Sequence, residues 1–312
     1  MTASTPQTPR HVWVDGELLP ADAPHVSAFD RGFQLGDGIF ETLRARGGRV
    51  TELDAHLDRL RRSAAGLSIA LAGDAAPSVA SGIQALLEAE GLAGADGDAA
   101  IRITVSRGRF TGRGLLPTDD PTPTIVVQAW PVVPPPPGHL ERGLHLVAST
   151  VRRDPSNPLA ALKTTSRADF VFARIEARAA GADDALFLTI DGFLSEATTA
   201  NVFVVRGRSL ATPSLDCAIL AGTTREWILA WARGAGLDAK EARLRAEDLA
   251  AADEVFLSSS VAGILPVTRF AGRAIGKGAP GPWTAAAREA REAFIGGESS
   301  PPRAAAGGSH GG

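Results

Sequence analysis

The stretch DALFLTIDGFLSEATTANVFVV, residues 184–205, contains three apolar segments separated by two turns. Each segment has the length and the apolar content of a strand buried in a sheet. The dipeptide Asp191-Gly192 is typical of the tight turn in a β-hairpin. The stretch therefore predicts three consecutive strands and places a sheet at the centre of the second half of the chain.

The segments on either side of this stretch alternate between strand and helix patterns. Towards the C-terminus, TREWILAWARG (224–234) and the segment 282–295 have the apolar spacing of helices. Towards the N-terminus, the patterns predict helices over 52–67, 78–90 and 167–181, and strands in VWVDGELLP (12–20), IFETLRARGGRV (39–50), IRITVSRG (101–108), TIVVQAW (124–130) and GLHLVAST (143–150). Strands and helices thus gather in two groups, which indicates two α/β or α+β domains.

The proline-rich segment PVVPPPPG, residues 131–138, can continue neither a helix nor a strand and is typical of a stiff linker. It predicts a smaller N-terminal sheet-and-helix domain over 1–130 and a larger C-terminal domain over 139–295. The last residues, 296–312, are of low complexity, and we expect them to be disordered.

The composition excludes several classes of protein. With 312 residues, 44% of them hydrophobic and 21% charged, the chain has the composition of a folded globular protein. Its formal net charge of -3 gives no electrostatic reason to expect nucleic acid or a membrane surface as a partner. The single cysteine, Cys217, excludes a cysteine-based zinc site, and the histidines lack the spacing of a zinc hydrolase, so we expect no metal. The start, MTASTPQTPR, lacks the apolar core of a signal peptide, and we expect a cytoplasmic protein.

The chain has only three lysines, and one of them stands in unusual surroundings. Lys163 follows the apolar segment PLAAL and precedes a predicted helix, whereas Lys240 and Lys277 lie in hydrophilic or turn-like segments. A lysine in a partly apolar site loses its proton more readily and becomes an amine nucleophile suited to Schiff-base chemistry. The alternative for each of the three is an ordinary solvated side chain. Lys163 is therefore the candidate nucleophile.

Two short polar segments have the composition of anion sites. The segment GTTR, residues 222–225, opens a predicted helix, so that backbone N–H groups, hydroxyls and the helix dipole converge there. The segment SSS, residues 258–260, closes the strand EVFL and offers further hydroxyls, while Arg59 on the predicted helix 52–67 offers a cation. A plain helix cap, a polar loop and a solvated helix face are the alternatives. Together these residues predict a site for one phosphate monoester.

Glu196 lies in FLSEATTANVFVV, between two apolar segments. A carboxylate in such a place costs free energy unless it is paired, and a cationic ring nitrogen is one partner that fits. An exposed turn residue is the alternative.

In their order and spacing, the motifs of the chain resemble those of the fold-type IV pyridoxal-phosphate enzymes. The motifs are DRGFQLGDGIFETLR (30–44), HLDRL (56–60), LKTTSR (162–167), GADDALFLTIDGFLSEATTANVFVV (181–205), GTTR (222–225) and DEVFLSSSVAGILPV (253–267). This family includes branched-chain aminotransferases, D-amino-acid aminotransferases and 4-amino-4-deoxychorismate lyases, and the resemblance covers about residues 12–292. It implies pyridoxal 5'-phosphate (PLP) as the cofactor, a small-molecule amino substrate that bears a carboxylate, and a homodimer.

The resemblance also implies a role for each matching residue. Lys163 matches the lysine that forms the Schiff base, and Glu196 matches the partner of the pyridine nitrogen. The phosphate ligands of the family are matched by Arg59, Thr223, Thr224 and Ser260, with Ser259 adjoining them.

The reaction that the resemblance implies is divided between two outcomes. Elimination, as in the lyases, is favoured by Thr42, Arg102 and Arg167, and Arg107 and Arg113 offer further guanidinium groups for substrate carboxylates. Such a lyase releases pyruvate and 4-aminobenzoate from aminodeoxychorismate.

Three departures from the family keep the alternatives open. Glu41 replaces a threonine found in some lyases, Ser166 replaces an asparagine, and Arg167 or Ala168 stands where branched-chain enzymes carry a tyrosine. The second hypothesis is an aminotransferase that passes an amino group from a branched-chain or D-type amino acid, or an amine, to a 2-oxo acid. The third is a protein that binds a phosphate ligand without the chemistry.

Overall fold

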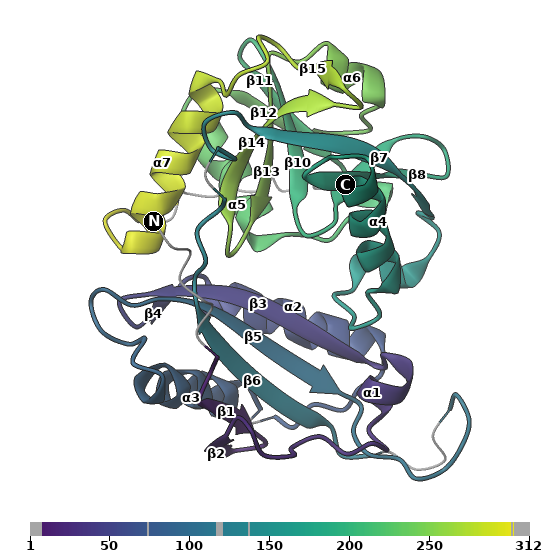
Figure 1. Cartoon of the computed structure of the whole chain (residues 1–312), viewed down its shortest axis with the longest axis vertical. Coiled ribbons are helices and arrows are strands. Elements are labelled where there is room, and N and C mark those ends of the chain that lie inside the picture. Colours follow the sequence, from purple (N-terminus) through teal and green to yellow (C-terminus); the bar gives the residue numbers. More distant parts are fainter. Residues whose placement is uncertain (1–7, 74, 117–120, 137, 301, 303–312) are drawn as a thin grey trace, which may run out of the picture. The chain divides into compact units, whose positions relative to one another are not determined.

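The computed structural model describes residues 8–73, 75–116, 121–136, 138–300 and 302 (Figure 1). The chain divides into two compact units. The first unit contains the chain up to Pro134 together with Leu162–Ala168, and the second contains Pro135–Ala161 and the chain from Asp169 onwards. Each unit has its own sheet and its own core, and the mixed α/β class predicted from the sequence is confirmed.

The first unit is built around an antiparallel sheet with the strand order β2-β1-β6-β5-β3-β4 among the described residues. Its elements are β1 (His11–Val14), β2 (Glu17–Pro20), α1 (Arg31–Leu35), β3 (Gly38–Arg46), β4 (Arg49–Val50), α2 (Leu53–Gly66), α3 (Ala75–Ala89), β5 (Asp98–Ser106) and β6 (Thr124–Pro131).

One face of this sheet forms the core of the first unit. Alternate residues of β3 and β5, such as Leu43 and Ile103, pack against Leu60 of α2 and Ile83 of α3. Because side chains alternate along a strand, the residues between them point to the opposite face. That opposite face carries Phe40 together with the polar side chains Thr42, Arg102, Thr104 and Gln128.

The second unit is built around a mixed sheet with the order β12-β11-β10-β13-β14-β7-β8-β9, to which β15 adds beside β14, among the described residues. The pairs β11 with β12, β14 with β7, and β7 with β8 are parallel. Its strands are β7 (Leu144–Arg153), β8 (Asp184–Thr189), β9 (Leu194–Ala197), β10 (Asn201–Arg206), β11 (Ser209–Pro213), β12 (Asp238–Ala242), β13 (Glu254–Ser259), β14 (Gly263–Phe270) and β15 (Arg273–Ala274).

Helices cover parts of this second sheet (Figure 1). They are α4 (Ala168–Ala179), α5 (Thr223–Gly234), α6 (Ala246–Ala250) and α7 (Pro282–Gly296), with short 3-10 turns η1 (Pro158–Ala161) and η2 (Leu215–Cys217). Ile228 of α5 and Phe294 of α7 share one cluster with Phe203 and Phe256 of the sheet, whose rings stack. Helix α5 is therefore packed against the aromatic core of the sheet.

The structure differs from the sequence prediction in helix α1, at Pro131 and at the start of α3, and also in one longer segment. Helix α1 was not predicted, because five residues are too few to show an apolar period. The helix is marked only by its ends: Asp30 accepts a hydrogen bond from Gly32 N at the start, and Gly36 has a φ of 65° at the end. Pro131 ends β6 instead of beginning a linker, and it pairs with Ala99. Helix α3 begins at Ala75, three residues before the predicted start.

The segment Leu162–Ala168 was predicted in the C-terminal domain and lies in the first unit. The backbone of Thr164 forms a bridge with that of Ile39 at the start of β3. A second tie is the hydrogen bond of 2.8 Å from Thr165 N to Gly38 O. Of the tail predicted to be disordered, Gly296 ends α7, and residues 301 and 303–312 lie outside the described residues.

Candidate active site

The candidate nucleophile is anchored within the first unit. Lys163 O accepts a hydrogen bond of 2.9 Å from Phe40 N on β3. Lys163 N donates to Ser63 Oγ on α2, at 3.2 Å. The backbone of Lys163 is therefore fixed to a strand and to a helix.

Three cationic side chains surround the ring of Phe40. Lys163 Nζ lies 4.7 Å from the ring centroid, Arg102 Cζ lies 4.0 Å from it, and Arg167 Cζ lies 5.8 Å from it. Cations within about 6 Å of an aromatic face are attracted by the ring. The structure thus brings three of the predicted site residues together around one side chain that the sequence did not single out.

Arg102 lies in the middle of a polar row across the sheet. Its Cα pairs with that of Thr42 on β3 and with that of Gln128 on β6. Among the described residues no acidic side chain forms an ion pair with Arg102, whose Nε donates to Thr104 Oγ1 at 3.1 Å. Burial lowers the pKa of this guanidinium. A half-buried cation without a protein counter-charge is suited to an anionic ligand.

Arg59 lies on the opposite, helix-covered side of the first sheet. Its Nε and Nη2 donate to the two carboxylate oxygens of Glu41, each at 2.7 Å, and His56 Nδ1 lies 2.8 Å from Glu41 Oε2. Burial alone would raise the pKa of Glu41, but the hydrogen bonds and charges of Arg59 and His56 lower it to about 2. The sequence named Arg59 and missed both partners, although His56 precedes it by one helical turn.

Arg107 is placed differently from the expectation. Its Nε and Nη2 donate to Asp37 at 2.8 and 3.1 Å, and its Nη1 and Nη2 donate to the carbonyl oxygens of Ser68 and Leu67. All three guanidinium nitrogens are thus engaged within the protein, so Arg107 is not available for a substrate carboxylate. Arg113 is exposed in the segment after β5.

Glu196 lies on β9 in the second unit, where its side chain is buried. Its Oε2 accepts a hydrogen bond of 3.1 Å from Leu220 N. Its Oε1 lies 3.8 Å from Nη2 of Arg153. This arginine is partly buried and also packs on the ring of Phe170. The sequence did not identify Arg153. A fixed carboxylate among apolar strands is the group that a protonated pyridine nitrogen needs.

The second unit also contains the predicted phosphate site. We call it the phosphate cup and use the name for Gly222, Thr223, Thr224, Ser259 and Ser260. Helix α5 begins at Thr223 and has no side-chain cap, because its N-cap residue is Gly222. Thr223 Oγ1 lies 3.5 Å from Ser260 Oγ, and Ser259 Oγ accepts a hydrogen bond from Ala262 N.

A steric constraint and an unsatisfied hydroxyl distinguish the surroundings of the phosphate cup. A Cβ on Gly222 would lie 2.2 Å from Asn201 Oδ1, so the chain needs glycine at the helix start. Ser258 Oγ is buried without a hydrogen-bond partner among the described residues. Hydroxyls, a helix N-terminus and an unsatisfied buried donor are the groups that bind phosphate.

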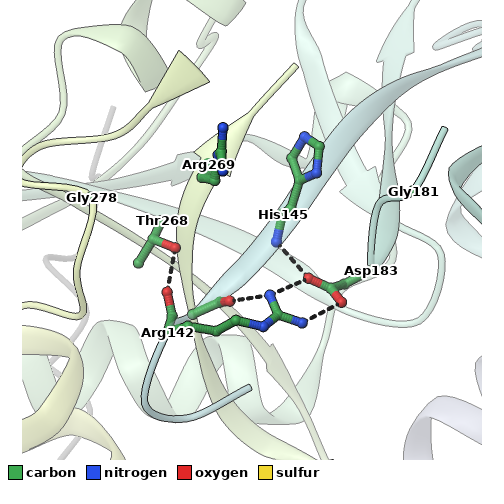
Figure 2. A pocket seen from close by; sticks show the side chains of 8 residues that line it. Arg142, His145, Gly181, Asp183, Thr268, Arg269 and Gly278 are labelled. Atoms are coloured by element: carbon green, nitrogen blue, oxygen red, sulfur yellow. Dashed lines mark hydrogen bonds and ion pairs between the residues drawn. The ribbon is translucent and has the colours of Figure 1, made fainter. Parts of the chain in front are cut away.

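A hollow of about 370 Å³ in the second unit contains none of these residues (Figure 2). Figure 2 shows that Arg142 and Asp183 close on each other there, with two hydrogen bonds of 2.8 Å. Those hydrogen bonds are the largest cause of the lowered pKa of Asp183, which is about 2. Within the hollow, Asp183 therefore has its counter-charge in Arg142. In the described part of the chain no cluster of histidine, cysteine and acidic residues fits a metal ion.

Comparison with known proteins shows the family to which the chain belongs. The family model described as "Amino-transferase class IV" matches residues 38–270. The chain belongs to the class IV aminotransferase family. This membership makes the protein an enzyme and replaces the alternative of a binding protein without chemistry.

Relatives within the family carry different names. The chain is 36% identical to a "Putative branched-chain-amino-acid aminotransferase" of Methanocaldococcus jannaschii, over 85% of this chain and 89% of that protein. It is 31% identical to an "Aminodeoxychorismate lyase" of Bacillus subtilis, over 83% of this chain and 86% of the other. The family is therefore shown, and the reaction within it is not decided by similarity.

A solved structure from Mycobacterium tuberculosis shares the fold. It is a hypothetical aminotransferase in its PLP-bound form, with a TM-score of 0.80, 28% identity, and coverage of 93% of this chain and 100% of that one. The fold-type IV resemblance and PLP as the cofactor of the family are thereby confirmed. No helix in the described ranges is long and apolar enough to cross a bilayer.

Proposed function

We propose that this class IV enzyme transfers the amino group of an α-amino acid to a 2-oxo acid. The observation that carries the proposal is Arg102, a half-buried guanidinium that shares the ring of Phe40 with Lys163 and has no acidic partner in the described part of the chain. A substrate carboxylate supplies the missing charge. Amino donor and oxo-acid acceptor both carry such a group, so a single arginine serves both halves of the reaction.

The residues of the chain divide the work. When PLP is bound, it carries the amino group and withdraws electrons from the adjoining carbon. Lys163 Nζ would hold the cofactor covalently in the resting enzyme. Once displaced by the amine of the substrate, it would take the proton from the α-carbon and return one. Glu196 would supply the negative charge for the pyridine nitrogen. The phosphate cup would hold the phosphate. The resemblance implies Arg59 as a further ligand, but its Nε and Nη2 are already bonded to Glu41.

A lyase acting on aminodeoxychorismate is the second candidate. The sequence favoured it, and the structure supports it by placing Thr42 opposite Arg102 and Arg167 beside the ring of Phe40. The substrate of a lyase carries two carboxylates. Of the three arginines that the sequence reserved for them, Arg107 is engaged with Asp37, and this shifts our proposal towards the aminotransferase.

A half-reaction on the purified holoenzyme separates the two candidates. D- and L-amino acids are added one at a time without any oxo acid, and the visible absorbance of the bound cofactor is recorded. We expect one class of amino acid to convert the spectrum stoichiometrically. Repeated release of pyruvate from aminodeoxychorismate, with a spectrum that amino acids leave unchanged, would establish the lyase instead.

Arg102→Met tests the carboxylate site directly. Methionine keeps much of the volume and removes the charge, so we expect KM for the amino donor and for the oxo acid to rise about tenfold to a hundredfold, the loss of one charge-assisted hydrogen-bonded pair. Arg61→Met, at an exposed position on α2, is the matched control and should leave both values unchanged. Steady-state kinetics with both substrates varied gives the answer. Unchanged KM values in Arg102→Met would remove Arg102 from the substrate site.

We also propose a homodimer, as the resemblance implies. Helix α4 exposes Val171, Phe172 and Ile175, with exposed fractions of 57%, 51% and 60%. An apolar helix face of this kind supports association with a second copy. Light scattering at micromolar concentration should give twice the mass of 32.3 kDa.

A further inference from the structure

Arg291 of α7 is a buried cation that the mechanism above does not use. Its side chain is only 1% exposed. The guanidinium carbon lies 5.1 Å from the centroid of the Trp227 ring and 5.2 Å from that of the Phe294 ring. Placing a cation in such surroundings costs free energy, and the two aromatic rings offset only a part of it. Because an apolar leucine or methionine would avoid this cost, the charge of Arg291 points to a specific role.

The contact that indicates the role is made with the phosphate cup. Arg291 Nη2 donates a hydrogen bond of 3.2 Å to Thr224 Oγ1. Thr224 is the second residue of α5, and its side chain is also buried. Arg291 therefore reaches from the body of α7 to the N-terminal turn of α5, the end of that helix that attracts anions.

The hydrogen bond restricts what the Thr224 hydroxyl can do. A hydroxyl has one proton to donate and two lone pairs that accept. Because a proton from Arg291 occupies one lone pair, the hydroxyl proton of Thr224 must turn towards another acceptor. An anion at the start of α5 is such an acceptor. The guanidinium thus orients a donor towards the anion, and it adds a positive charge behind the helix start.

We propose that Arg291 is a positioning residue of the phosphate cup, which fixes Thr224 Oγ1 as a donor and strengthens the binding of a phosphate monoester. The proposal rests on the assignment of the phosphate cup to the PLP phosphate, made above as part of the proposed function. Arg291 touches Thr224 and acts through it, so it is not a catalytic residue.

The test compares two ligands that differ only in the phosphate. Apoprotein is titrated with PLP and with pyridoxal, which lacks the phosphate, and the dissociation constants are measured from absorbance and protein fluorescence. We expect Arg291→Met to weaken PLP about tenfold and to leave pyridoxal unchanged, because the lost contact serves the phosphate alone. The rise in melting temperature caused by inorganic phosphate should shrink in the same variant. Arg288→Met, at a partly exposed position on the same helix, is the matched control.

Variants of Thr224 separate the proposal from the assignment beneath it. Thr224→Val removes the hydroxyl and should match Arg291→Met, while the double variant should be no weaker than either single one, since both break one relay. Thr224→Ser should bind PLP like the wild type. If Thr224→Val leaves the PLP affinity unchanged, the phosphate cup itself is wrongly assigned. If Thr224→Val weakens PLP and Arg291→Met does not, only the role of Arg291 is overturned.

A purely structural role for Arg291 predicts a different pattern. It would weaken PLP and pyridoxal by the same factor, and this result would also overturn the proposal. Should Arg291→Met fail to fold, Arg291→Lys keeps the charge but loses the planar stacking and the fixed direction of the donor. We then expect Arg291→Lys to lose less PLP affinity than Thr224→Val does, with the pyridoxal affinity again unchanged. Equal losses of affinity for the two ligands would contradict the inference.

Discussion

Replacing Lys163 with alanine should lower kcat by at least about a thousandfold, because a nucleophile and a proton carrier are lost together. The backbone around Lys163 should persist, since its ties to Phe40 and Ser63 are made by main-chain atoms of the lysine. The variant should therefore fold normally. It should also retain a weakened, non-covalent affinity for PLP through the phosphate cup.

The measurement is turnover together with the visible spectrum of the loaded protein. Lys163→Ala should lack the absorbance band of the covalently bound cofactor. Lys240→Ala and Lys277→Ala replace exposed lysines and are the matched controls. Both should keep the rate and the spectrum of the wild type. Turnover at the normal rate in Lys163→Ala would contradict the assignment of the nucleophile.

Glu41→Gln should lower the free energy of unfolding by about 3 kcal/mol at neutral pH, because it leaves a buried guanidinium without its counter-charge. Glu41 is fully buried, and it is held by two hydrogen bonds from Arg59 and by His56. Denaturant unfolding, followed by far-UV circular dichroism, measures the difference. Asp58→Asn on α2, the helix that carries Arg59 and His56, breaks only an exposed pair with Arg61. It should change the free energy of unfolding by less than about 0.5 kcal/mol.

The pH dependence of this contribution has a definite sign. The folded-state pKa of Glu41 is about 2, below its ordinary value of 4.5. The contribution is therefore fully present above pH 4.5 and is lost as the pH falls from 4.5 towards 2. Between these two pH values, the difference in the free energy of unfolding between the wild type and Glu41→Gln should disappear. An equal stability of the two proteins at pH 7 would show that the pair does not stabilise the fold.

Motifs that are local in sequence were the predictable part of this protein. The strands and turns of residues 184–205, the helix of residues 53–66 and the start of α5 follow from apolar spacing and from glycine positions within short windows. The residues Lys163, Glu196 and Thr223 were named from such windows. Their roles stay predictions within the class IV family to which the chain belongs.

Contacts between distant segments were not predictable in the same way. Arg107 was offered to the substrate because nothing near it in sequence shows its partner, and Asp37 lies 70 residues away. Arg291 gave a weak signal, since its spacing to Ala287 and Phe294 places it on the apolar side of α7. A single arginine on an apolar face is easily taken for a solvated residue at the edge of that face. Only its contacts identify it as buried.

The pairing of Leu162–Ala168 with β3 has a consequence for the order of synthesis. When residues 1–134 have emerged from the ribosome, all strands of the first sheet are outside, but the lysine that the unit carries is not. The start of β3 stays unbridged until residues 162–168 have emerged as well. A fragment that stops before this segment carries no amine for the cofactor, however well it folds. Expression in two pieces would therefore restore the enzyme only if the cut left residues 162–168 free to join the earlier strand.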